Sequence, residues 1–127
     1  MPPNVRLLGR IRDQKELAAL YTLADAVLLT SQRETFSMVC AESLCCGTPV
    51  AGFMAGAPEM IALPAYAAFV PYGDADRLEK VLQQMLHTAY DRAAIALEAQ
   101  AVYDRSRMID AYCALYDAVL KKEGAHF

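Results

Sequence analysis

Histidine and cysteine are scarce in this chain, and their spacing argues against a metal site. There are two histidines, His87 and His126, among 127 residues. The four cysteines are Cys40, Cys45, Cys46 and Cys113. They lack the paired spacing of a zinc site, and two histidines cannot complete a ligand cluster. We therefore expect no bound metal, surface histidines, and buried reduced thiols that pack as small hydrophobes, with a redox switch at Cys45 and Cys46 as the alternative.

Long apolar runs and an excess of charge of one sign are also absent. The longest apolar run, AVLLT after Asp25, is far shorter than the ~20 residues of a membrane span. The opening MPPNVRLLGR lacks the ordered regions of a signal peptide. The 12 basic and 15 acidic residues are mixed along the chain and leave a net charge of −3, which argues against nucleic acid and a polybasic membrane patch. We expect a soluble, cytoplasmic protein with no nucleic-acid partner.

Hydrophobic residues make up 56% of the sequence, enough for the core of one domain over residues 1–127. Short β-rich or apolar runs alternate with helical patterns up to residue 72, and helical patterns fill the rest. Predicted strands are 4–9, 26–30, 49–53 and 66–70; predicted helices are 13–24, 37–46, one turn near Pro58, and 74 to about 122 with a weaker middle. The alternation predicts an α/β fold, a Rossmann-like parallel sheet of about four strands flanked by helices, with a helical C-terminal end. We divide it into an α/β core (1–72) and C-terminal helices (73–127).

The ends of the predicted helices carry local signals. Asp13, with Glu16 three positions later, forms a capping-box-like start for the first helix. Asp74 is the predicted N-cap of the helix that follows the last strand. Gly47 and Pro49 end the second helix, because glycine accepts positive φ and proline cannot continue the hydrogen-bond ladder.

Two glutamates eight positions apart, Glu34 and Glu42, bracket a largely apolar stretch, TFSMVCA. The loop TSQRETFS directly follows strand 26–30, and ligands of parallel sheets lie beyond the carboxyl ends of the strands. A helix that begins there offers free N–H groups to an anion such as phosphate. Glu42 would lie one turn inside an apolar helix, where a carboxylate needs a hydrogen-bond donor such as a ribose diol. The alternative is that Glu42 is partly exposed or bonded to a backbone amide, and that Glu34 is a solvated loop residue.

The stretch NVRLLGRI…ELAALYTLADAVLLTSQRETFSMVCAESLCCGTPVAGFMAGAPEMI resembles the C-terminal, nucleotide-sugar-binding half of a GT-B fold glycosyltransferase, in particular glycosyltransferase family 4 (glycosyl transferases group 1). The motif-bearing part runs from about Asn4 to Ile61, and DAYCALYDAVL resembles the family's closing helices. The Glu-x7-Glu element, Gly47-Thr48-Pro49-Val50 and Gly56-Ala57-Pro58-Glu59 occur in the family's order.

The resemblance implies a role for each residue of this loop. Glu34 would be the catalytic residue that approaches the donor sugar, and Glu42 would hold the ribose. Thr35, Phe36, Ser37 and Met38 would bind the donor, the last three through amides that contact its diphosphate. Thr35 and Ser37 stand where the family commonly has glycine, so a serine hydroxyl could donate to phosphate instead.

The reaction implied is sugar transfer with retention from a nucleoside diphosphate sugar, the co-substrate, with electrostatic stabilisation of the departing diphosphate and no metal or other cofactor. Less than half of such an enzyme is covered, and the N-terminal acceptor domain is missing. Arg33 is close to the loop but does not match the family's diphosphate clamp. We therefore expect the isolated chain to be inactive, with peripheral membrane association only in the full enzyme.

Two further choices remain open. The alternative function is a non-catalytic domain of the same fold that binds a nucleotide sugar or a partner protein, and a GT-B epimerase is a third reading. In the truncated sheet, either residues 4–9 pair directly with strand 26–30, or two copies form a homodimer through the bare edge. We expect the first arrangement.

Overall fold

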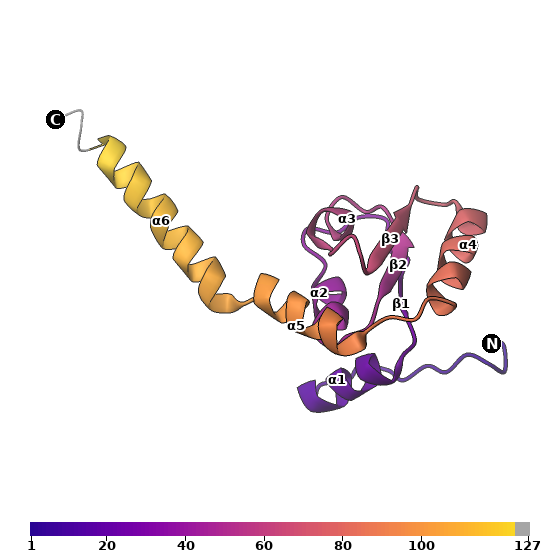
Figure 1. Cartoon of the computed structure of the whole chain (residues 1–127). Helices are drawn as coiled ribbons and strands as arrows, with labels where there is room; N and C mark the ends of the chain where they lie inside the picture. Colours follow the sequence, from indigo (N-terminus) through magenta and orange to yellow (C-terminus); the bar gives the residue numbers. More distant parts are fainter. Residues whose placement is uncertain (124–127) are drawn as a thin grey trace.

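The computed structural model describes residues 1–123, which form a three-stranded parallel sheet flanked by helices (Figure 1). The strands are β1 (Val27–Leu29), β2 (Val50–Phe53) and β3 (Ala67–Val70), in the spatial order β1-β2-β3. The helices are α1 (Gln14–Leu23), α2 (Met38–Cys45), α3 (Pro58–Ile61), α4 (Ala75–Leu86), α5 (Arg92–Val102) and α6 (Arg105–Glu123). The prediction of an α/β fold with a parallel sheet is confirmed.

The fourth predicted strand is wrong. Residues 4–9 form no strand and are exposed throughout, and in Figure 1 the N-terminal segment runs away from the sheet. Gly9 breaks any extended run with a φ of +70°. β1 pairs only with β2 among the described residues, so the predicted pairing of 4–9 with 26–30 is wrong too. A β-rich segment forms a strand only where a neighbouring edge takes up its hydrogen bonds.

The sheet has a core on each face. Leu29 and Val50 face α2 and α5, where they pack with Leu44 and Ile95. On the opposite face Ala51 packs with three side chains, which are Val70, Leu78 and Met85. Because successive strand residues point to opposite faces, the neighbours Val50 and Ala51 contribute to different layers. The core therefore extends beyond residue 72 through α4 and α5.

β1 is less buried than its uniformly apolar sequence predicts. Leu29 is buried, but Leu28 is 46% exposed. α4 packs over β2 and β3, and Leu28 lies on that same face of the sheet, at the open edge. A strand without alternation was expected to be covered on both faces, and this expectation is wrong for the α4 side of β1.

The predicted helix ends are confirmed. The Asp13 carboxylate accepts the amides of Lys15 and Glu16 at 2.7 and 3.3 Å, and that of Asp74 accepts the amide of Arg77 at 3.0 Å. These bonds satisfy N–H groups that the first helical turn leaves unpaired. Local sequence thus defines where α1 and α4 begin.

Helix α6 projects from the body as a separate arm (Figure 1). Residues 104–122 are all exposed, although the sequence pattern gives this helix a strong apolar stripe. No helix in the described part of the chain is long and apolar enough to cross a membrane. The stripe of α6 therefore remains without a covering surface.

The cysteines differ in burial. Cys40 is fully buried in the core, Cys45 and Cys46 are half-buried, and all are free thiols. Cys113 lies exposed on α6, so the expectation of a buried thiol is wrong there. Burial raises the pKa of both Cys45 and Cys46, which favours the neutral, unreactive thiol over a redox switch.

Candidate functional site

An open hollow lies at the carboxyl ends of β1 and β2, where parallel sheets bind ligands. We call it the carboxyl-end hollow. Its lining residues come from the loops after the two strands: Arg33, Glu34, Thr35, Phe36, Ser37, Met38, Ala55 and Gly56. The Glu34 amide donates to the Ala55 carbonyl at 3.0 Å, which ties the two loops together. The structure thus brings five of the six predicted site residues to one place.

Glu59 holds the second of these loops. Its carboxylate accepts the amides of Ala55 and Gly56 at 3.0 and 2.7 Å. Desolvation opposes ionisation of this carboxyl group, but the hydrogen bonds from the two amides prevail and lower its pKa. Glu59 therefore stays ionised and fixes the backbone that lines the hollow.

Ser37 has the most unusual environment in the site. It adopts a left-handed backbone with a φ of 73°, the one positive φ outside glycine among residues 1–123. L-residues favour glycine at such positions because Cβ approaches the neighbouring carbonyl. Its hydroxyl oxygen is buried without a hydrogen-bond partner in the described part of the chain. Leaving a buried polar group unpaired costs about 1–3 kcal/mol, so the site favours a ligand that pairs with this hydroxyl.

The N-terminus of α2 opens into the same hollow. Ser37 occupies the N-cap position but makes no side-chain capping bond, and no acidic residue lies in the first turn. The first amides of an α-helix have no intrahelical acceptor, and the helix dipole adds partial positive charge there. Together with Arg33 on the rim, this end of α2 is suited to an anion.

Glu42 lies apart from the other site residues. It is half-buried and lines a second hollow, between α1 and α2, which also includes Tyr21 and Cys46. The Tyr21 hydroxyl donates to Glu42 Oε2 at 3.1 Å. The carboxylate therefore has a donor of its own, a tyrosine from α1 rather than a backbone amide. Met38 and Glu42 are four residues apart, so they share one side of α2 and connect the two hollows.

Tyr21 is held in turn from behind the sheet. Its carbonyl accepts the Thr48 hydroxyl at 2.5 Å, and Arg92 donates to that same hydroxyl oxygen. Arg92 also donates to the carbonyls of Thr22 at 2.8 Å and Gly47 at 3.0 Å. Thr48 is fully buried, as expected for a residue that supports packing. The end of α1, which buries no residue itself, is thus anchored by polar bonds.

Alkaline pH is expected to weaken the fold at this site. Burial, reinforced by the hydrogen bond to Glu42, raises the pKa of Tyr21 from 10.0 to about 12. In Cys40, burial and the charge of Glu34 raise the pKa from 9.0 to about 12. Because both groups hold their protons more tightly when folded, unfolding releases protons above about pH 9 and the free energy of unfolding falls as pH rises towards 12.

Urea unfolding at pH 8, 9, 10 and 11 measures this loss. Tyr21→Phe removes the titrating hydroxyl, so the fall in unfolding free energy above pH 10 should become shallower. A variant with the same slope as the original chain would contradict the role given to Tyr21.

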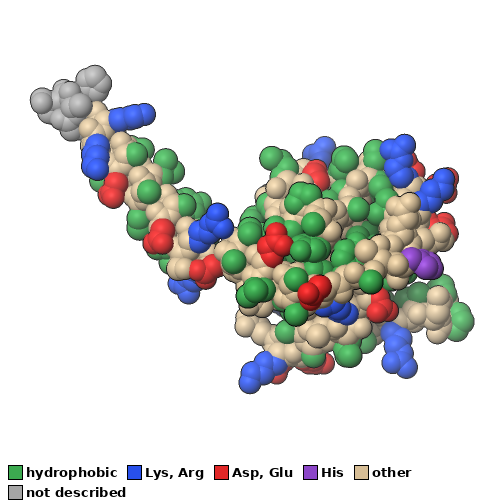
Figure 2. Space-filling model, in the orientation of Figure 1, with side chains coloured by type: hydrophobic (Ala, Val, Ile, Leu, Met, Phe, Trp, Pro, Cys, Tyr) green, Lys and Arg blue, Asp and Glu red, His purple; other side chains and the backbone are tan. Residues whose placement is uncertain are grey.

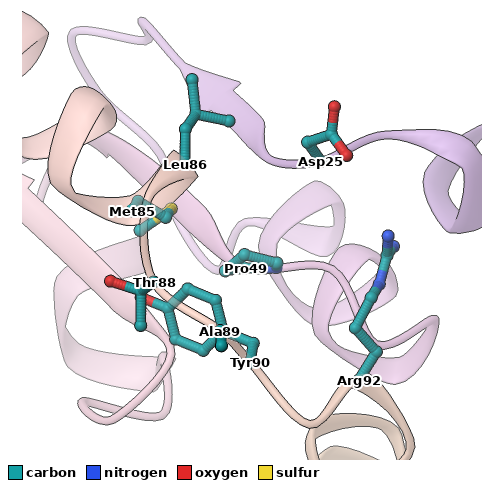
Figure 3. Close-up of a pocket in the computed structure, with 8 residues that line it drawn as sticks. All are labelled: Asp25, Pro49, Met85, Leu86, Thr88, Ala89, Tyr90 and Arg92. Atoms are coloured by element: carbon teal, nitrogen blue, oxygen red, sulfur yellow. The ribbon is translucent and has the colours of Figure 1, made fainter.

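Another hollow, at the amino ends of the strands, is less suited to a ligand (Figure 3). Asp25 and Pro49, which precede β1 and β2, lie on its rim together with Arg92. The donors of Arg92 already bind protein oxygens. Among residues 1–123 no three His, Cys, Asp or Glu side chains come together as metal ligands. His87 is exposed, as predicted, and His126 lies outside the described residues.

Three residues of the site were not predicted from the sequence: Tyr21, Glu59 and Arg92. Glu59 had a signal, since it lies in a Gly-Ala-Pro-Glu turn in which a carboxylate can reach amides three and four residues earlier. Tyr21 and Arg92 had none, because they bind partners 21 to 70 residues away.

Comparison with known proteins gives two matches. The family described as "Glycosyl transferases group 1" matches residues 1–102. The chain is similar to a D-inositol 3-phosphate glycosyltransferase of Streptosporangium roseum, 34% identical over 89 residues. That alignment covers 69% of this chain but 20% of the relative, so the matched part spans about a fifth of the relative's length. The family match covers both loops of the carboxyl-end hollow and Glu42, and the chain belongs to the glycosyl transferases group 1 family.

Proposed function

We propose that this chain is the donor-binding part of a glycosyltransferase, which transfers a sugar from a nucleoside diphosphate sugar to a glycan or lipid-linked acceptor with retention. The family match and the name of the relative support glycosyl transfer in general. The observation that carries the finer proposal is the uncapped start of α2, where the buried Ser37 hydroxyl has no partner within residues 1–123.

The diphosphate is assigned to the carboxyl-end hollow. The amides of Phe36, Ser37 and Met38, at the start of α2, would donate to its oxygens, and Thr35 lies on the same loop. The Ser37 hydroxyl would gain the acceptor that it lacks, and Arg33 adds a positive charge at the rim. Donors fixed in place before the reaction stabilise the charge that develops on a departing diphosphate.

The two glutamates are assigned to the two ends of the donor. Glu34 shares the hollow with these amides and would accept hydroxyls of the transferred sugar, as the catalytic residue. Glu42 lies one helical turn beyond Met38, about 6 Å along α2. Tyr21 occupies its Oε2 atom, and Oε1 would accept a ribose hydroxyl. The nucleotide would therefore lie along one side of α2.

The isolated chain is proposed to bind the nucleotide without transferring sugar. It matches about a fifth of the relative's length, and the acceptor would be held by the N-terminal acceptor domain that this chain lacks. A cytoplasmic location stays a prediction, as does peripheral membrane association of the full enzyme.

Nucleotide titration followed by two-dimensional amide NMR tests the proposal. UDP, GDP and ADP are each added to the chain, and one of them should shift the amides of residues 34–42 selectively. Glu42→Gln should weaken that nucleotide at least about tenfold, because a hydrogen bond to a charged group contributes about 1.5–3 kcal/mol.

Glu98→Gln is the matched control. Glu98 also accepts a tyrosine hydroxyl, that of Tyr66 at 2.9 Å, but it lies on α5 away from both hollows. This variant should bind the nucleotide as the original chain does. If no nucleotide shifts residues 34–42 of the folded chain at millimolar concentration, the proposed donor site is wrong, and the alternative of a protein-interaction domain gains support.

A further inference from the structure

The arm formed by α6 carries a large apolar surface that nothing in the described structure covers. The helix has 19 residues, and seven large hydrophobic side chains on it are 45% to 65% exposed. They are Met108, Ile109, Tyr112, Leu115, Tyr116, Val119 and Leu120. Figure 2 shows hydrophobic side chains along the projecting arm. Such a surface on a protein usually marks a contact site.

The side chains of α6 divide into two opposite faces. At 100° per residue, the seven hydrophobic residues fall within one arc of less than half the helix circumference, with Tyr112 and Tyr116 near its centre. Their rings pack against each other with centroids 6.4 Å apart. The opposite arc holds charges of both signs and small residues: Arg107, Asp110, Ala111, Ala114, Asp117, Ala118 and Lys121. The apolar face is thus continuous from one end of the helix to the other.

This face continues into an apolar hollow at the base of the arm. Phe36 and Met38 from the body, Val102 at the end of α5, and Met108 at the start of α6 line it. We call it the base hollow. A helix lying antiparallel to α6 would cover the stripe and end with its C-terminal apolar residues, Val119 and Leu120, at this hollow.

We propose that α6 is a self-association surface, on which two copies of the chain pair their α6 helices in antiparallel orientation. In this arrangement the two bodies lie at opposite ends of the pair, so that they do not obstruct each other. The tip of each α6 reaches the base hollow of the other copy, about 28 Å along the helix. The inference is independent of nucleotide binding.

The size and chemistry of the surface favour a second copy. Seven half-exposed large side chains in each of two copies would bury on the order of 1,200–1,500 Å² in total, which is the range of stable specific interfaces. An anionic membrane would instead favour basic residues beside the stripe. Here Asp110 and Asp117 offset Arg107 and Lys121. The stripe therefore fits another apolar helix better than a lipid surface.

Cys113 offers a natural reporter of this pairing. It lies one residue from the midpoint of α6 and is exposed, whereas Cys40 is buried. In an antiparallel pair centred on the helix midpoint, the Cys113 residues of the two copies lie close to each other. A short bis-maleimide should join two chains at Cys113, and Cys113→Ser should abolish the joined species.

Sedimentation equilibrium over a concentration series tests the proposal directly. The chain should behave as a dimer at high concentration, and Tyr112→Glu should raise the dissociation constant at least about tenfold by placing a charge in the stripe. Ala114→Glu adds the same charge on the opposite face of the same helix and should leave the dimer unchanged. Because residues 104–122 bury nothing against the body, both variants should keep the circular dichroism of the original chain.

Two results would overturn the inference. A chain that sediments as a monomer at every concentration has no self-association surface on α6. A dimer that persists in Tyr112→Glu without cross-linking at Cys113 associates elsewhere, and the open edge of β1 is then the surface to examine.

Discussion

Gly47→Ala should lower the free energy of unfolding by about 3 kcal/mol or more, because it combines two separate costs. Gly47 has a φ of +80°, a conformation in which an alanine is strained. A Cβ atom built there would also overlap the backbone carbonyl of Arg92 at the start of α5. Since backbone cannot move aside as a flexible side chain can, α5 would have to shift away from the turn that ends α2.

Gly73→Ala separates these two costs. Gly73 has a similar φ, +87°, but a Cβ there would meet nothing within 4 Å. This variant should lose only about 1 kcal/mol from backbone strain. Urea unfolding of both variants measures the difference, which represents the close approach of α5 to Gly47. Equal losses would show that the contact with Arg92 yields at no cost.

Ile95→Ala should lower the free energy of unfolding by about 3 kcal/mol. Ile95 on α5 is fully buried and packs with Leu29, Leu44 and Val50, so the change removes contacts between the helix layer and the sheet. Its surroundings come from three different elements and cannot close easily around the cavity.

Leu97→Ala is the control within the same helix. Leu97 is 74% exposed, and its truncation should change the unfolding free energy by no more than about 0.5 kcal/mol. Chemical denaturation of the two variants compares the same helix with and without a core contact. Similar losses in both would contradict the placement of α5 against the sheet.

The parts of the fold that could be predicted from the sequence depend on local interactions. The starts of α1 and α4 follow from Asp13 and Asp74, which bind amides two or three residues away. Strands β1, β2 and β3 were found because each is a short apolar run between helical patterns. In all these cases the signal and the structure lie within one turn or one strand.

The parts that could not be predicted depend on neighbours distant in sequence. Residues 4–9 have the composition of a strand but meet no sheet edge, and Leu28 faces a side of the sheet that α4 does not reach. The stripe on α6 predicted a buried helix, yet amphipathicity indicates only which face can be buried and not what buries it.

The candidate site was partly predictable for the same reason. Glu34 and the loop to Met38 follow β1 directly, so the strand alone places them at the carboxyl end of the sheet. The donor to Glu42 was sought in a ligand, but Tyr21 supplies one from α1. Its role depends on how α1 packs against α2, which the sequence pattern does not specify.

The bonds made by Arg92 have a consequence for a chain that is being synthesised. The Thr22 carbonyl and its Arg92 donor are 70 residues apart. A ribosome that adds about 5–20 residues per second needs roughly 4–14 seconds to cover that separation. α1 emerges early, but it buries no residue, and these bonds cannot form until residue 92 has been made. During that interval the growing chain keeps α1 without the guanidinium that later secures its end.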